Sequence, residues 1–298
     1  MTVQEAYTRL MYQLFELYDD REAENIADMI IEHITGFRKI DRIINKQFPL
    51  SEAQIQLLNG YTIELLQHKP VQYVLHEAWF AGMKLYVDEN VLIPRPETEE
   101  LVRWIIADCR LPIADSKTNS QSPIPNSTLL DIGTGSGCIS VALKKKLSGV
   151  EIHALDISGE ALNVANRNAA TQQTKMIFYH LNILDRDQWQ SLPIFNVIVS
   201  NPPYVKQSES STMQKNILKY EPHIALFVPN DDALLFFKAI AEFGLQHLNA
   251  NGKLFFEINE TLGKEVTALL EQYGYNNIEL KKDFQGKDRM VKAEAPNP

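Results

Sequence analysis

From Thr128 onward, short apolar runs alternate with longer stretches of helical periodicity. The apolar runs predict strands at 129–132, 152–157, 176–180, 197–200 and 254–258. The periodic stretches predict helices near 138–147, 159–171, 231–248 and 261–273. This alternation is typical of strand–helix–strand units, which build a mainly parallel sheet with helices on both faces. Two strand-like runs, 276–282 and 288–294, predict a terminal hairpin that adds an antiparallel edge strand.

Residues 1–75 instead carry helical periodicity almost throughout, which predicts an all-α bundle. Asp19 and Ser51 are expected to cap helices, and Gly36 is expected to end one. The segment holds 7 Lys or Arg against 11 Asp or Glu, so it does not suit a DNA-gripping module. We expect this domain to recognise a substrate protein.

Residues 76–94 are rich in strand-forming side chains and turn signals, which predicts a β-hairpin linking two domains. The second predicted domain, 95–298, begins with a helix at about 97–109. Residues 111–127 are rich in Ser, Pro and Asn, so we expect a disordered surface loop there.

The composition narrows the function classes. Of the 298 residues 45% are hydrophobic and 22% charged, as in globular proteins, and the net charge is −9. No bulk positive field is available to hold a nucleic-acid backbone. Two cysteines, Cys109 and Cys138, suit a reducing compartment. Without a membrane-length apolar run or a signal-like start, the sequence predicts a cytoplasmic protein.

A glycine-rich loop follows the first predicted strand of the second domain. Residues 131–137 read Asp-Ile-Gly-Thr-Gly-Ser-Gly and open a helix, where open α/β sheets bind ligands. Asp156 ends the next strand, where a carboxylate can accept hydrogen bonds from both ribose hydroxyls. The pair predicts an adenosine cofactor. A plain strand-to-helix turn is the alternative, and the absence of a third dinucleotide glycine at Cys138 disfavours NAD.

The sharpest motif is a strand that runs into Asn201-Pro202-Pro203-Tyr204. Tandem prolines lack N–H donors and leave carbonyl groups unpaired, so the loop becomes a rigid acceptor site. The Asn201 side-chain carbonyl and the Pro202 main-chain carbonyl can hold both N–H groups of a planar amide or exocyclic amine, and Tyr204 offers an aromatic face. A simple proline turn is the alternative. No dedicated general base is evident.

Further motifs surround these two loops. Pro70-Val71-Gln72-Tyr73 and residues 92–99, Leu-Ile-Pro-Arg-Pro-Glu-Thr-Glu, precede the glycine loop. After it come Glu221-Pro222, Phe256-Glu257-Ile258 and Asp283-Phe284 through Asp288-Arg289. With these motifs the chain resembles class I S-adenosylmethionine-dependent methyltransferases, specifically the release-factor glutamine N5-methyltransferases, over nearly its whole length.

The resemblance implies a doubly wound, seven-stranded, Rossmann-like methyltransferase sheet with an N-terminal helical bundle and a connecting hairpin. It implies transfer of a methyl group from S-adenosyl-L-methionine to the glutamine of the Gly-Gly-Gln motif in class I peptide chain release factors. These factors are the expected partners of a monomeric enzyme that needs no direct nucleic-acid contact, membrane or metal.

The resemblance also implies roles for individual residues. The methionine portion of the cofactor would be held by Gly133, Thr134, Gly135, Ser136 and Gly137, the ribose by Asp156, and the adenine by Asn182 and Ile183. The substrate glutamine would be held by Asn201, Pro202, Pro203 and Tyr204, with Asn201 also touching the cofactor and Asn201, Pro202 and Tyr204 acting in catalysis. A lid on the cofactor pocket would include Arg95, Glu97 and Thr98.

The chain departs from the family pattern at residues 228–233, at Asn259 and at Asn182, which replaces a common acid. Three other functions compete: methylation of a ribosomal-protein glutamine, N6-methylation of adenine in nucleic acid, and a catalytically silent cofactor-binding scaffold. Among other polar residues, His180, His223 and Cys138 are interpreted as structural or inert. Glu257 could orient the pocket or only satisfy nearby donors.

Overall fold

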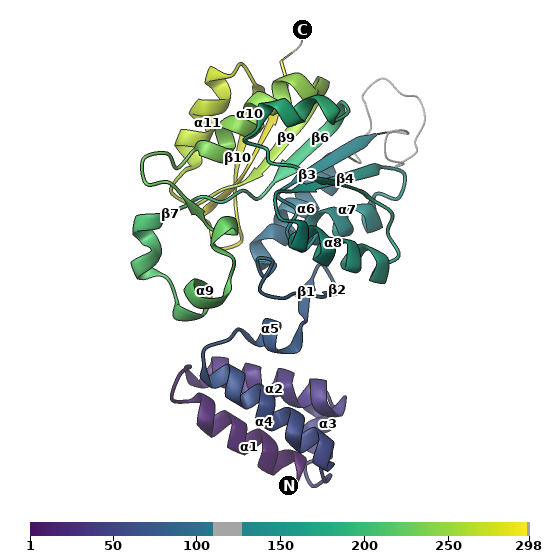
Figure 1. Cartoon of the computed structure of the whole chain (residues 1–298), viewed down its shortest axis with the longest axis vertical. Helices are drawn as coiled ribbons and strands as arrows, with labels where there is room; N and C mark the ends of the chain where they lie inside the picture. The colour runs from purple at the N-terminus through teal and green to yellow at the C-terminus, as the bar shows by residue number, and fades with distance from the viewer. Residues whose placement is uncertain (110–126, 297–298) are drawn as a thin grey trace. The chain divides into compact units, whose positions relative to one another are not determined.

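A computed structural model describes residues 1–109 and 127–296 (Figure 1). The chain forms two compact units: residues 1–77 with 213–220, and residues 78–212 with 221–298. The predicted loop at 111–127 lies outside the described residues except for Ser127, which is buried and precedes the first sheet strand. Residues 213–220 were expected in the second domain but pack with the first unit.

The first unit is helical, as the periodicity predicts. Its helices are α1 (Val3–Leu14), α2 (Asp20–Thr35), α3 (Lys39–Ile44), α4 (Glu52–Leu66), α5 (Val71–Leu75) and α9 (Lys215–Tyr220). Side chains of Asp19 and Ser51 cap α2 and α4, and Gly36 ends α2 with a φ of 74°. Helix α9 joins this unit through the Tyr220 hydroxyl, which donates to the carbonyl of Gln67 at 2.9 Å.

The second unit is built on a seven-stranded sheet in the order β10-β11-β9-β6-β3-β4-β5. The strands are β3 (Thr128–Ile132), β4 (Glu151–Asp156), β5 (Ile177–His180), β6 (Phe195–Ser200), β9 (Leu248–Glu257), β10 (Asn276–Lys282) and β11 (Asp288–Glu294). Strands β5, β4, β3, β6 and β9 pair in parallel. The strand order reverses between β3 and β6, which makes that point the expected ligand site of such a sheet.

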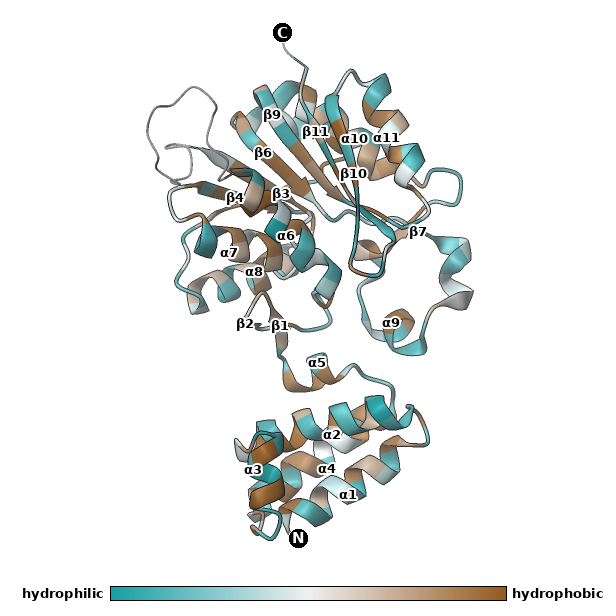
Figure 2. Ribbon diagram, turned by 180° about the vertical axis from the view of Figure 1, so that it is seen from behind, coloured by the Kyte–Doolittle hydropathy of each residue, from teal (hydrophilic) through white to brown (hydrophobic). Residues whose placement is uncertain are grey.

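The antiparallel strand is interior, which corrects the predicted antiparallel edge. Strand β11 pairs antiparallel with both β9 and β10, so β10 forms the edge. Met290 and Val291 of β11 are fully buried, one on each face, and such a strand needs a neighbour on both sides. Strand β10 is mostly exposed and largely polar in Figure 2, as protected sheet edges are.

Helices cover both faces of the sheet because strand residues alternate between them. Helices α10 (Leu235–His247) and α11 (Gly263–Gln272) share a core with Ile132, Ile198 and Phe256. Helices α6 (Pro96–Cys109), α7 (Cys138–Lys146) and α8 (Gly159–Thr171) cover the other face, where α6 and α7 pack on Val199 and Phe255. The predicted helices are therefore confirmed, although α10 starts later than the expected residue 231.

Short elements complete this unit. The linking hairpin consists of β1 (Ala78–Phe80) and β2 (Met83–Leu85) and is shorter than the predicted span 76–94. The 3₁₀ turns are η1 (Arg186–Ser191), η2 (Gln207–Thr212) and η3 (His223–Ala225). Strands β7 (Val205–Lys206) and β8 (Phe227–Val228) pair in parallel, which brings the Asn201 loop beside η3.

Helix α10 approaches the segment before β10 so closely that Gly244 has no room for a side chain. A Cβ at Gly244 would lie 2.3 Å from the Tyr275 hydroxyl oxygen, which donates to the Ala241 carbonyl. We expect Gly244→Ala to lower the free energy of unfolding by about 1–3 kcal/mol through this overlap.

Tyr275→Phe removes the overlapping oxygen, so in that background Gly244→Ala should become neutral or stabilising by up to about 1 kcal/mol, because alanine favours helix. Denaturant unfolding of the four variants measures both effects. Equal losses in the two backgrounds would contradict the overlap.

Candidate active site

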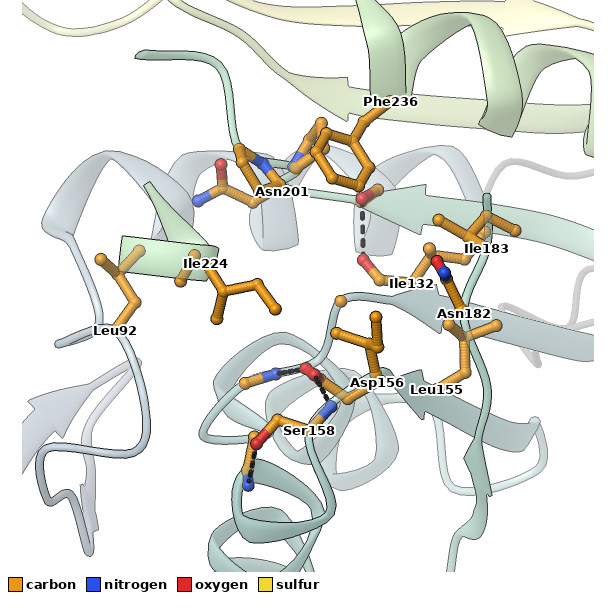
Figure 3. Close-up of a pocket in the computed structure, with 18 of the residues that line it drawn as sticks. Leu92, Ile132, Leu155, Asp156, Ser158, Asn182, Ile183, Asn201, Ile224 and Phe236 are labelled. Carbon is orange, nitrogen blue, oxygen red and sulfur yellow. Dashed lines mark hydrogen bonds between the residues drawn. The ribbon is translucent and has the colours of Figure 1, made fainter. Parts of the chain in front are cut away.

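A cavity of about 280 Å³ opens at the carboxyl ends of β3, β4 and β6, at the point where the strand order reverses (Figure 3). Many sequence-predicted site residues line it together: Gly133, Gly135, Asp156, Asn182, Ile183, Asn201, Pro202 and Pro203. Residues separated by as many as 70 positions thus share one site. Thr134, Ser136, Gly137, Tyr204, Arg95, Glu97 and Thr98 lie outside its lining.

The glycine loop presents bare backbone to the cavity. Gly133 and Gly135 have φ values of 70° and 53°, which side chains rarely adopt, and a Cβ on either would meet only open space. The amides of Gly133 and Thr134 donate to the Leu155 carbonyl at 2.9 and 3.0 Å, which anchors the loop to β4. Gly137 serves packing instead, because a Cβ there would crowd Ala165 of α8 at 3.1 Å.

Thr134 and Ser136 of this loop are buried and do not line the cavity. Thr134 Oγ1 donates to Asp131 Oδ2 at 2.7 Å and lies 3.0 Å from Ser140 Oγ. Asp131 is fully buried, and burial raises the pKa of its carboxyl group to about 6. Ser136 is buried as well, and its carbonyl accepts from Asn168 Nδ2 at 2.9 Å. Thr134 and Ser136 therefore support the loop from beneath.

Asp156 places a carboxylate at the cavity wall. Its Oδ2 accepts from the Gly135 amide and its Oδ1 from the Ser158 amide, both at 2.9 Å. Burial raises the pKa of this group. Each carboxylate oxygen can accept a second hydrogen bond, so two acceptor positions remain for a pair of hydroxyl groups. The position of the Asp156 carboxylate is compatible with the predicted contact to ribose, and that contact stays a prediction.

The end of the cavity beyond Asp156 is mainly apolar. Leu155 and Ile183 flank it in Figure 3, and Asn182 lies beside them. The Asn182 side-chain carbonyl accepts from the Leu184 amide at 3.0 Å, so that oxygen shapes its own turn. Apolar walls with one amide nearby suit a flat ring such as adenine.

Three groups of lining residues were missed by the sequence interpretation. Phe236 and Ile240 of α10, Ile224 of η3 and the segment 90–92 all reach the cavity. The helix periodicity predicted α10 but not which of its residues would extend past the sheet. Neither Leu92 nor Ile224 carried a polar signal, although Leu92 begins the 92–99 motif and Ile224 lies two residues after Pro222.

The Asn201 loop forms the opposite end of the cavity. Ser200, the last residue of β6, donates from its hydroxyl group to the Ile132 carbonyl of β3 at 2.7 Å, which fixes where the loop leaves the sheet. Asn201 then enters the cavity lining, followed by Pro202 and Pro203. No hydrogen bond of the Asn201 side chain is found within 1–109 and 127–296, so its amide oxygen is open to a ligand.

Tyr204 lies beside the cavity, with its ring packed against the core beneath α10 and α11. Burial, followed by the nearby Glu257 carboxyl group, raises the pKa of the Tyr204 hydroxyl to about 12. The phenol therefore stays protonated at neutral pH and does not serve as a base. Its predicted stacking on the substrate stays a prediction.

The predicted lid residues begin α6, next to a buried carboxyl group. Thr98 is 2% exposed and donates to Glu257 Oε2 at 2.6 Å, and Arg95 Nη2 lies 2.6 Å from Glu221 Oε1. Burial raises the pKa of Glu257 to about 7, while the Thr98 hydrogen bond and Arg289 oppose the shift. Arg95, Glu97 and Thr98 therefore surround Glu257 and Tyr204 rather than the cavity.

The remaining polar candidates have structural contacts. Burial, followed by Asp131, raises the pKa of the Cys138 thiol to about 12, so almost no thiolate forms. His180 Nε2 lies 2.8 Å from the Ile157 carbonyl, and His223 packs edge-on against Phe227. Within the described ranges no three His, Cys, Asp or Glu side chains gather as a metal site. No helix there is long and apolar enough to span a membrane.

A doubly wound sheet with a glycine loop, a carboxylate after the next strand and a proline-locked acceptor loop defines the methyltransferase class. Two domain families match the sequence: the methyltransferase small domain at residues 118–223 and the PrmC N-terminal domain at residues 6–75. The release factor glutamine methyltransferase of Flavobacterium psychrophilum is 41% identical, covering 98% of this chain and 99% of the relative. The release factor glutamine methyltransferase of Bacteroides thetaiotaomicron is 36% identical, covering 97% of this chain and 98% of the relative.

Solved structures agree with the fold. A methyltransferase from Pyrococcus furiosus gives a TM-score of 0.50 at 18% identity, covering 83% of this chain and all of that one. The Thermus thermophilus 16S rRNA N2 G1207 methyltransferase gives a TM-score of 0.51 at 15% identity, covering 74% of this chain and 49% of that one. The relatives that match nearly the whole chain identify the family as well as the fold. The chain belongs to the release factor glutamine methyltransferase family.

Glu257 makes the folding stability depend on pH. Its folded-state pKa of about 7 exceeds the unfolded value of 4.5, so the folded state holds the proton more tightly. The tighter binding of the proton stabilises the folded state fully below pH 4.5, and this stabilisation is lost as the pH rises to 7. Between pH 4.5 and pH 7 the free energy of unfolding of the wild type should fall because of Glu257. For Glu257→Gln we expect this fall to be smaller by roughly 1–3 kcal/mol.

Denaturant unfolding at a series of pH values measures the difference, with the exposed Glu271→Gln as the matched control. Parallel curves for the wild type and Glu257→Gln would show that Glu257 does not hold its proton in the folded state.

Proposed function

We propose that this protein transfers the methyl group of S-adenosyl-L-methionine to the side-chain amide nitrogen of the glutamine in the Gly-Gly-Gln motif of class I release factors. The observation that carries the proposal is the open amide oxygen of Asn201 on a proline-locked loop at one end of the cavity. The near full-length relatedness to release factor glutamine methyltransferases supports the same substrate.

The residues around the cavity fit the cofactor. The two free acceptor positions of Asp156 would take the ribose hydroxyl groups, and the apolar faces of Leu155 and Ile183 would take the adenine. The bare backbone at Gly133 and Gly135 leaves room for the methionine portion. When bound, S-adenosyl-L-methionine supplies an electrophilic methyl group on a sulfonium sulfur.

The Asn201 loop would hold and activate the substrate amide. An amide nitrogen is a weak nucleophile because its lone pair is delocalised into the carbonyl group. The Asn201 side-chain oxygen and the Pro202 carbonyl can each accept one N–H, which orients the nitrogen and favours the transition state, where these N–H groups become more acidic. The prolines prevent the loop from rearranging, so little reorganisation is needed when the substrate arrives.

The proton released from the amide nitrogen has no dedicated acceptor among the residues that line the cavity. Tyr204 remains protonated, and the acceptor positions that the two backbone amides leave free on Asp156 would be taken by the ribose hydroxyl groups. We infer that positioning by the Asn201 loop supplies most of the rate and that water takes the proton. The N-terminal unit, which matches the PrmC N-terminal domain, is proposed to contact the release factor.

Replacing Asn201 tests the proposed reaction. Asn201→Ala removes one of the two acceptors, so we expect the turnover number to fall by about 10²-fold or more, while the dissociation constant of S-adenosylmethionine changes less than about threefold. Purified release factor is incubated with each variant, and mass spectrometry of the Gly-Gly-Gln peptide measures methyl gain.

Asn163→Ala, on the exposed face of α8, is the matched control. A collapse of cofactor affinity with unchanged turnover at saturation would contradict the role of Asn201. If the wild type leaves the Gly-Gly-Gln glutamine unmodified, the proposed substrate is wrong, and ribosomal protein and adenine-containing nucleic acid become the substrates to test.

Replacing Asp156 tests the cofactor site. Asp156→Asn keeps an oxygen for one backbone amide but loses the charge and one acceptor, so we expect the dissociation constant of S-adenosylmethionine to rise by about 10- to 100-fold. Turnover at saturating cofactor should change much less. Isothermal titration measures the affinity, and the exposed Asp187→Asn is the control. Unchanged affinity would place the ribose elsewhere.

A further inference from the structure

Two segments without strand partners form the apolar walls at the Asn201 end of the cavity. Leu92 comes from the segment before α6, and Ile224 comes from η3. Figure 3 shows both on the Asn201 side of the cavity, away from Asn182 and Ile183. Ile224 is 55% exposed although it lines the cavity, so it stands at the mouth.

One buried carboxylate ties these two walls together. Glu221 lies two residues before η3, and its side chain is 1% exposed. Its Oε1 accepts from Arg95 Nη2 at 2.6 Å, and its Oε2 accepts from the Ile93 amide at 3.3 Å. Both donors belong to the chain that follows Leu92, more than 120 residues away in sequence. The two oxygens of one carboxylate therefore hold one wall to the other.

Backbone hydrogen bonds connect the Arg95 side and the η3 side of this interaction to neighbouring elements. The Arg95 carbonyl accepts from the Thr98 amide at 3.1 Å, which joins it to the start of α6. On the other side, the Val205 amide donates to the Leu226 carbonyl at 3.0 Å, which joins the η3 segment to the end of the Asn201 loop. A displacement of either wall would therefore alter the space in front of Asn201.

We propose that Arg95 and Glu221 are a positioning pair, which holds the Leu92 wall and the Ile224 wall at the spacing that admits the substrate side chain to Asn201. This inference rests on the proposed function for its substrate. Neither residue lines the cavity, so both act through the apolar residues that they position. Loss of the pair should weaken the engagement of the release factor more than the binding of the cofactor, because the residues expected to hold the ribose and the adenine line the cavity at the end of β4 and in the loop after β5, whereas Arg95, expected in the lid, lies outside the lining.

The test uses a double-mutant cycle in the full chain: Arg95→Met, Glu221→Gln and both together. We expect each single variant to lower kcat/KM for the release factor by about tenfold or more, chiefly by raising KM, because displaced walls weaken the binding of the substrate side chain in the ground state and the transition state alike. The S-adenosylmethionine dissociation constant should stay within about threefold of the wild-type value, as the two walls do not carry Asp156. The double variant should lose no more than the worse single variant.

A second measurement does not depend on activity. Hydrogen–deuterium exchange should rise at residues 90–95 and 222–226 in each variant, while the strands of the sheet keep wild-type protection, which also shows that the variants fold. Arg103→Met is the matched control, because it breaks an exposed pair with Glu99 on α6 and should leave KM and exchange at the walls unchanged.

The inference is overturned if the single variants keep the wild-type KM, if their losses multiply in the double variant, or if exchange at the two segments stays unchanged. Failure of the proposed function shows differently: the wild type itself would not methylate the release factor. In that case exchange at the two walls still decides whether Arg95 and Glu221 hold them.

Discussion

The parallel pairing of β6 beside β3 is the constraint on which the rest of the catalytic unit depends. Leu129 through Ile132 lie in register with Val197 through Ser200, although β4 and β5 intervene in sequence. The chain must therefore cross from one edge of the sheet back to its middle, and the connections that follow the two strands run in opposite directions across the sheet. The glycine loop and the Asn201 loop leave the sheet on the two sides of this point. The Ser200 hydroxyl bond to Ile132 fixes their separation.

Around that point the protein buries carboxyl groups whose surroundings differ. Asp131 and Glu257 lie on the α6 and α7 face, held by hydroxyl groups of Thr134 and Thr98, and burial raises the pKa of both. Asp156 also has a raised pKa, but it accepts two backbone amides and still faces the cavity. Buried carboxyl groups need such partners. The first two lie beneath the loops, whereas Asp156 lines the cavity.

Much of this arrangement could be predicted from local sequence. The strands and the flanking helices follow from hydrophobic periodicity, and the cavity-lining positions of Gly133, Asp156 and Asn201 follow from their place at the carboxyl ends of strands. Thr134 and Ser136 could not be separated from the glycines between them, because the direction of a side chain in a loop depends on what lies beneath it. Here Asp131 decides the direction of the Thr134 hydroxyl group.

The sequence by itself determined a helical unit followed by a mainly parallel sheet, and the two loops that line the cavity, because those depend on periodicity and on the backbone limits of glycine and proline. Only the tertiary structure decided that β11 enters the sheet between β9 and β10, that residues 213–220 pack with the first unit, and that Leu92, Ile224 and Phe236 complete the cavity. Each of these rests on contacts between segments distant in the chain, where no local preference of the residues distinguishes one partner from another.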